Sequence, residues 1–89
     1  MFNREPFSYA CRMRIEPADV YLRKLGKRIR ELREAKGLTQ EDFDDGTRLG
    51  ITARGLQEIE YGNNNAKIYT LYKIARRLGV NVGDLLDFK

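Results

Sequence analysis

The chain has 89 residues, of which 42% are hydrophobic and 34% are charged, and its 17 lysines and arginines against 13 aspartates and glutamates give a net charge of +4. This length excludes a two-domain enzyme, and no apolar run approaches the roughly 20 residues that cross a bilayer. One cysteine and no histidine exclude a disulfide framework and a Cys/His zinc site.

These limits predict a soluble, cytoplasmic protein that needs no metal or other cofactor and no small-molecule ligand. The first residues lack the long apolar core of a secretory signal, which favours the same compartment. With no histidine, no phosphate-cradling glycine loop and no paired nucleophile and base, an enzyme is not expected. The positive net charge favours polyanionic partners.

An extended arm is predicted over residues 1–16. Within it, FSYACRMRI (residues 7–15) alternates strictly between apolar and more polar side chains, which is typical of a β-strand. A single strand has no partner for its backbone groups, so we expect this arm to pair with a second copy of the chain, with Phe7 and Tyr9 in the contact. The alternative is a frayed terminus.

The first helix is expected from Pro17 to the glycine at position 37. Pro17 suits a first helical turn, and Gly37 suits the stop. Apolar residues recur at steps of three and four along the segment and form one stripe: Leu22, Leu25, Ile29 and Leu32.

Two short helices are expected to follow. Thr39 can cap the first of them, which ends at Gly46, and Thr52 can cap the second, which ends before Gly62. The apolar side of the second helix comprises Leu56 and Ile59.

Two more helices complete a predicted set of five. Helical spacing of apolar residues continues from Ile68 to Leu78, Gly79 ends that helix, and Asn81 can cap a last turn. We expect the last helix to contribute to a dimer contact through Val82, Leu85, Leu86 and Phe88.

Three segments together resemble the Cro/CI-type (XRE-like) helix-turn-helix family of bacterial and phage transcriptional regulators: LGKRIRELREAKGLTQEDF, LGITARGLQEIEYG and TLYKIARRLGVNVGDLL. The resemblance covers residues 25–86. It implies an all-α, five-helix, lambda-repressor-like domain over residues 17–89. It also implies a sequence-specific regulator that binds double-stranded DNA as a homodimer on an inverted repeat. The alternative is an antitoxin, or another protein-binding module of the same fold, that holds a toxin or other protein.

The resemblance also implies roles for individual residues. The reading helix would face DNA with Thr52, Ala53, Arg54, Gln57 and Glu58, and phosphates would be contacted by Gln40, Asn63, Asn65 and Lys67. Arg33 and Glu60 would form a structural ion pair. Side-chain chemistry fits base reading, because arginine can bind guanine, glutamine can bind adenine and a carboxylate can accept from cytosine. The alternatives are a solvated surface charge at Arg54, an ordinary helix residue at Gln40 and plain turn chemistry in the asparagine run.

The sequence departs from the family before the reading helix. The stretch DDGTRL between Phe43 and Gly50 is two residues longer than the usual link, which leaves the angle of the reading helix open. Gly55 lies inside that helix, where glycine costs about 1 kcal/mol relative to alanine.

Overall fold

The computed structural model describes residues 15–47 and 50–88, and these residues form an all-helical fold, as predicted. Phe7, Tyr9 and all but the last two residues of the predicted arm lie outside the described residues. Within the described part there are four α-helices and one 3-10 helix, and no strand. Their bounds are α2 Ala18–Ala35, η1 Glu41–Phe43, α3 Ala53–Glu60, α4 Ile68–Leu78 and α5 Val82–Leu85.

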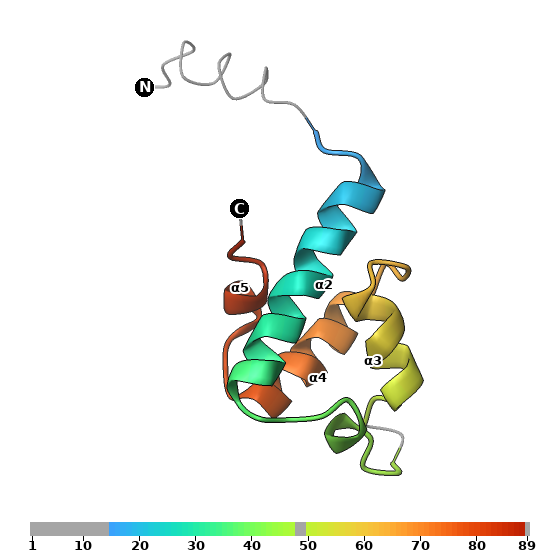
Figure 1. Cartoon of the computed structure of the whole chain (residues 1–89), viewed down its shortest axis with the longest axis vertical. Helices are drawn as coiled ribbons and strands as arrows, with labels where there is room; N and C mark the ends of the chain where they lie inside the picture. Colours follow the sequence, from blue (N-terminus) through green and yellow to red (C-terminus); the bar gives the residue numbers. More distant parts are fainter. Residues whose placement is uncertain (1–14, 48–49, 89) are drawn as a thin grey trace.

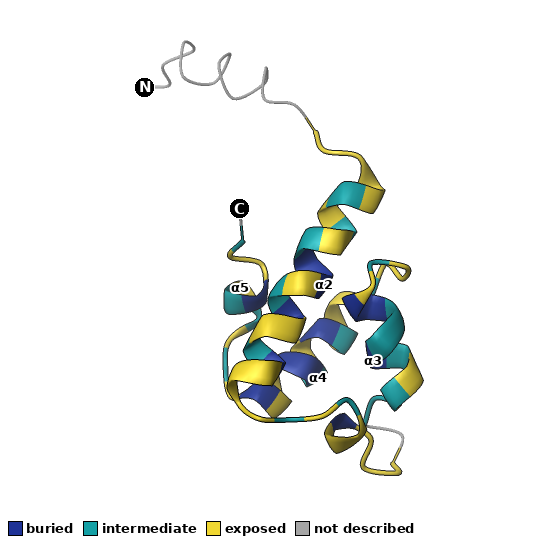
Figure 2. Ribbon diagram, viewed as in Figure 1, coloured by how far each residue is buried: buried dark blue, intermediate teal, exposed yellow. Residues whose placement is uncertain are grey.

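The long helix α2 forms the centre of the fold. Figure 1 shows α3 on one side of it, α5 on the other, and α4 crossing between them. The core lies where these helices meet, and Figure 2 shows its buried positions on the inner faces. Its largest fully buried side chains are Ile29, Phe43, Leu56, Ile74, Leu78 and Leu85. No helix of the described residues is long and apolar enough to cross a membrane.

The apolar stripe of α2 is buried unequally. Leu25 and Ile29 lie in the core, whereas Leu22 and Leu32 are only partly buried. For Leu22 the reason is visible in Figure 2, where the first turns of α2 extend beyond the other helices, whereas Leu32 packs against the edge of the core. The predicted helix is therefore present, and its first turns project past α3, α4 and α5.

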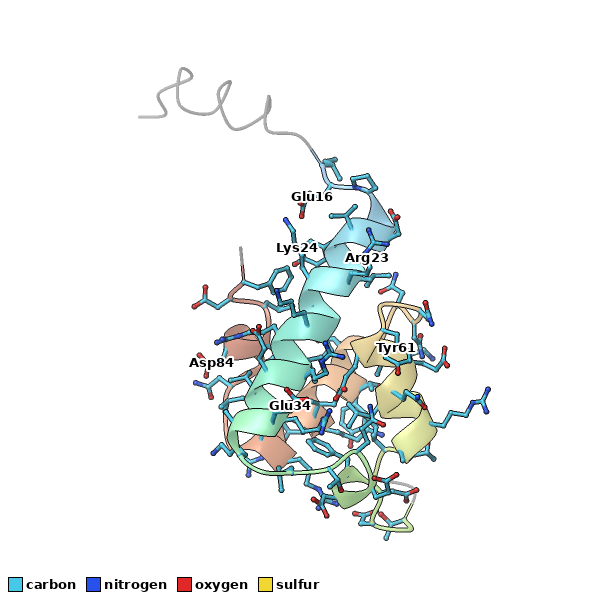
Figure 3. The ribbon with its side chains drawn as sticks, in the orientation of Figure 1. Glu16, Arg23, Lys24, Glu34, Tyr61 and Asp84 are labelled. Atoms are coloured by element: carbon cyan, nitrogen blue, oxygen red, sulfur yellow. The ribbon has the colours of Figure 1, made fainter. Side chains whose placement is uncertain are left out.

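Leu85 corrects the prediction of a dimer contact. Its side chain is fully buried in the core of its own chain, so it cannot also contact a second copy. The helix that carries it is held inward, because Arg28 Nε of α2 donates a hydrogen bond to the Asp84 carbonyl over 2.9 Å. Figure 3 labels Asp84 on α5 beside α2. Val82 and Phe88 also pack against this core, and the Phe88 ring lies 5.1 Å from that of Tyr21.

The segment predicted as a second helix, from Thr39 to Gly46, forms only the 3-10 turn Glu41–Phe43. Its start is capped as expected, since Thr39 Oγ1 accepts from the Asp42 N–H and Asp42 Oδ2 accepts from the Thr39 N–H. The aspartates after Phe43 then compete with helix formation. Asp44 Oδ1 accepts from the Gly46 N–H and Asp45 Oδ1 accepts from the Thr47 N–H, which folds the backbone into turns.

Candidate nucleic-acid interface

Helix α3 begins at a side-chain cap. Thr52 is extended, with φ −72° and ψ 152°, and its hydroxyl oxygen accepts a hydrogen bond from the Gly55 N–H over 3.0 Å. The expected cap is therefore formed, and it uses one of the two acceptor lone pairs of the Thr52 hydroxyl. The hydroxyl hydrogen remains a donor, which suits a phosphate oxygen.

The two sides of α3 differ sharply in exposure. Leu56 and Ile59 are buried against the core, while Arg54 is exposed and Gln57 is partly exposed. Because the helix is only eight residues long and rests on one face, its other face is available to a partner.

The residues that the resemblance assigns to DNA are all at least partly accessible. Thr52, Arg54, Asn63, Asn65 and Lys67 are exposed, and Gln40, Ala53, Gln57 and Glu58 are partly buried. Five of them lie at the start of α3 or along it, Asn63, Asn65 and Lys67 lie between α3 and α4, and Gln40 lies before η1 and contacts the end of α3. The structure thus brings them around one short helix.

Helix α3 ends in a turn that uses part of the asparagine run. Gly62 has φ +80°, and the N–H groups of Gly62 and Asn63 donate to the carbonyls of Ile59 and Glu58. The Asn63 backbone N–H is therefore engaged, and its exposed side chain remains for a phosphate. A side chain at position 62 would lie 2.7 Å from Arg23 Cγ, and Figure 3 shows Arg23 on α2 near this end of α3.

Arg33 and Glu60 join α2 to the end of α3. Arg33 Nε lies 2.7 Å from Glu60 Oε2, and Nη2 lies 3.1 Å from Oε1, so the pair is bidentate. The Glu60 side chain is fully buried. Its hydrogen bond raises the pKa of Arg33 further, which keeps the guanidinium charged. Arg33 Nη1 also donates to the Leu38 carbonyl over 2.8 Å, so the same side chain fixes the chain after α2.

Gln40 completes this cluster. Its amide Nε2 donates to Glu60 Oε1 over 3.1 Å, which connects the segment before η1 to the end of α3. A side-chain amide has two N–H donors, so one donor can hold Glu60 while the other meets a phosphate. Supporting α3 and contacting a phosphate are therefore compatible at Gln40.

The longer link before α3 is fastened to the rest of the domain. The Ile51 N–H donates to the Phe43 carbonyl over 3.2 Å, which closes the loop at its base. Arg77 Nη2 lies 3.2 Å from Asp45 Oδ2, and Lys73 Nζ lies 3.4 Å from the Gly50 carbonyl oxygen. Helix α4 therefore holds this loop at two points.

Asp45 is the centre of that loop. Hydrogen bonds from the Thr47 hydroxyl and N–H lower the pKa of Asp45, and Arg77 adds to the effect. Gly50 packs closely here, since a Cβ at that position would lie 2.1 Å from Asp45 Oδ1. Sequence reasoning gave this loop no such anchors, because Arg77 and Lys73 lie more than twenty positions away.

Gly26 is a further residue that sequence reasoning missed. A Cβ on Gly26 would lie 2.4 Å from the Glu60 carbonyl oxygen and 2.5 Å from that of Ile59. The glycine therefore lets α2 and the end of α3 touch through their backbones. A glycine within an otherwise strong helix pattern was the available signal, since such a residue often marks close packing.

Comparison with known proteins places these features in a family. The family model described as helix-turn-helix matches residues 29–85. An uncharacterised HTH-type transcriptional regulator of Sinorhizobium fredii is 39% identical over 66 residues, covering 73% of this chain and 83% of that protein. The HTH-type transcriptional regulator DdrOP3 of Deinococcus deserti is 34% identical over 64 residues, which cover 72% of this chain and 48% of the DdrOP3 chain.

A solved structure agrees with the fold. The restriction-modification controller protein C.AhdI from Aeromonas hydrophila superposes with a TM-score of 0.68 at 33% sequence identity. The match covers 74% of this chain and 97% of that one. The helical arrangement described above is therefore shared with a protein of known structure.

Proposed function

Since the chain belongs to the helix-turn-helix family, we propose that it is a sequence-specific DNA-binding transcriptional regulator that acts as a dimer on an inverted-repeat operator. The observation that carries the proposal is the division of α3. Its inner side is buried, and its outer side presents the exposed Arg54 with the partly exposed Gln57. A short helix whose inner side packs against the core can enter the major groove with its outer side toward the base edges.

The proposed readers have complementary chemistry. Arg54 can donate two hydrogen bonds to guanine O6 and N7, and Gln57 can bind adenine N6 and N7. Glu58 can accept from cytosine N4, and Ala53 can contact a thymine methyl group. These four side chains would read the base sequence, whereas the Thr52 hydroxyl would donate a hydrogen bond to a phosphate oxygen of the DNA.

A second group of residues would position the helix. Gln40 contacts Glu60 at the end of α3, and Asn63, Asn65 and Lys67 follow that end in the chain. Their polar and basic side chains suit phosphate oxygens. Contacts of this kind fix the register of the protein on the duplex without selecting a sequence. Regulation would follow from occupancy, because a bound dimer beside a promoter blocks or recruits polymerase.

The dimer is proposed to use the arm, with Phe7 and Tyr9, and the remaining apolar residues near the C-terminus. Leu86 is 38% exposed, while Val82 and Phe88 are partly covered by their own chain. Two reading helices in such a dimer would lie about 34 Å apart, one turn of B-DNA. Analytical ultracentrifugation of Leu86→Glu tests this contact. We expect the dimer of this variant to dissociate at a higher protein concentration than the wild-type dimer, and an unchanged dissociation constant would contradict the proposal.

The main test is selection of bound duplexes from a random DNA pool by the purified protein, followed by a salt series on the winner. We expect an enriched inverted repeat whose affinity falls steeply with salt. Absence of enrichment, with weak binding at low salt alone, would contradict the proposal and favour the alternative of an antitoxin or another protein-binding module. Co-purification of a tightly bound second chain would support that alternative.

A further inference from the structure

The outer face of α4 carries a cluster of large apolar side chains that the proposed reading of DNA does not use. Ile68 is 66% exposed, Tyr69 55% and Tyr72 47%. The two tyrosine rings stack with centroids 5.8 Å apart and an interplanar angle of 20°. Exposed aromatic side chains gathered on one face are characteristic of protein interaction sites.

Basic side chains border the same face. Tyr69, Tyr72, Lys73, Arg76 and Arg77 line a shallow hollow of about 370 Å³. Lys73 Nζ lies 5.4 Å from the centre of the Tyr69 ring, where a cation is attracted by the aromatic face. The surface thus combines an apolar floor with a cationic border, and we refer to these five residues and Ile68 as the α4 face.

The contacts already made at its edge indicate which groups the α4 face accepts. Arg77 forms an ion pair with a carboxylate oxygen of Asp45 at 3.2 Å, and Lys73 donates a hydrogen bond to the carbonyl oxygen of Gly50 at 3.4 Å. Carboxylates and main-chain carbonyls are both abundant in an acidic peptide. Arg76 is exposed one turn beyond Tyr72 and adds a third positive charge.

Other occupants fit this chemistry less well. Two copies meeting through the same face would bring Lys73, Arg76 and Arg77 against their own equivalents, and like charges held close repel. Single-stranded nucleic acid needs open ring faces for base stacking, whereas the Tyr69 ring is already in contact with Tyr72 and Lys73.

We propose that the α4 face is a docking site for an acidic segment of another protein that also carries apolar side chains. Leucine or phenylalanine residues of the segment would pack against Tyr69, Tyr72 and Ile68, and its aspartates or glutamates would pair with Arg76 and its neighbours. None of the six residues of the α4 face is among those proposed to contact DNA, so its test does not require an operator.

The experiment measures binding of a fluorescein-labelled 12-residue peptide of alternating acidic and leucine or phenylalanine residues, by fluorescence anisotropy, to the full chain. Arg76→Glu and Arg30→Glu form a matched pair, because both replace an exposed helical arginine and change the net charge equally. We expect Arg76→Glu to weaken binding about tenfold or more and Arg30→Glu to change it less than about threefold. We expect Tyr72→Ser to weaken binding of the same peptide by about tenfold.

Several results would overturn the proposal. Equal losses of affinity in the two arginine variants would show that binding depends on net charge alone. Equal binding of a peptide with serine in place of its apolar residues would show that the apolar side chains of the α4 face do not contribute. If the peptide fails to bind while Arg76→Glu changes the oligomeric state, the face belongs to a second copy. If a single-stranded or duplex oligonucleotide binds with the same residue dependence and the peptide does not, the face belongs to nucleic acid. Circular dichroism checks folding, and should Tyr72→Ser unfold, the matched arginine pair still decides.

Discussion

Gly26 of α2 lies in main-chain contact with Glu60 of α3, so close that an added Cβ would fall 2.4 Å from the Glu60 carbonyl oxygen. We therefore expect Gly26→Ala to lower the free energy of unfolding by about 1–3 kcal/mol, because backbone atoms must move to make room. This net loss already includes the gain of about 1 kcal/mol that alanine brings to a helix interior. Urea denaturation of the purified proteins measures it.

Gly83→Ala is the matched control. Gly83 is also helical, in α5, and a Cβ there would meet no atom within 4 Å. The same substitution is expected to leave stability unchanged or raise it slightly. If Gly26→Ala behaves like Gly83→Ala, the close packing of α2 on α3 is wrong.

Removal of one partner from the buried ion pair is expected to be severe. Glu60→Ala leaves the Arg33 guanidinium, whose side chain is 11% exposed, without its carboxylate. We expect a loss of about 3 kcal/mol or more in the free energy of unfolding. The double variant Arg33→Met with Glu60→Leu is expected to be less destabilised than Glu60→Ala alone. If its loss in the free energy of unfolding equals the sum of the losses in the single variants Arg33→Met and Glu60→Leu, the two residues are not coupled.

The stability of the loop before α3 is expected to depend on pH through Asp45. Its pKa is lower in the folded chain because Thr47 and Arg77 favour the carboxylate. A lowered pKa means that the stabilisation is complete above the unfolded-state pKa, about 3.9, and is lost as the pH falls through the folded-state value. Asp45→Asn keeps an acceptor oxygen and removes the charge, so its melting temperature is expected to lie below wild type at pH 7 and to approach it at pH 2. A constant difference across this range would refute the assignment.

Substitutions in the proposed interface are expected to separate reading from positioning. Arg54→Ala is expected to cost about 1–3 kcal/mol on the selected operator and to relax preference at one base pair. Lys67→Ala is expected to weaken all duplexes alike and to reduce the salt dependence by about one counterion. Titrations of operator and single-base variants measure both effects. Unchanged affinity and preference in Arg54→Ala would show that Arg54 is not a reader.

Local features of the fold were predictable from the sequence. Gly62 and Gly79 end helices α3 and α4 with φ +80° and +74°, a conformation that glycine adopts readily. Asn81 caps α5 together with Asp84, which was foreseen only for Asn81. Such signals succeed because a cap or stop depends on residues within about four positions of each other.

Features that depend on distant residues were not predictable in the same way. Periodicity showed that Leu85 has an apolar environment, but it did not show whether its own core or a second copy provides it. The second helix was overestimated, because the turn-forming side chains of Asp44 and Asp45 outweighed the cap at Thr39. The contact of Gly26 with α3 joins positions more than thirty residues apart, so the glycine in a helix pattern signals close packing without identifying its partner.

The division of α3 into a buried and an outward side has a consequence for how such a domain can diversify. Leu56, Ile59 and Glu60 hold the helix in place, while Arg54 and Gln57 point away from the core. Exchanging the outward side chains would leave the core contacts intact. Under the proposed function, a few substitutions at these positions would change the DNA preference in evolution or in the laboratory while the scaffold stays the same.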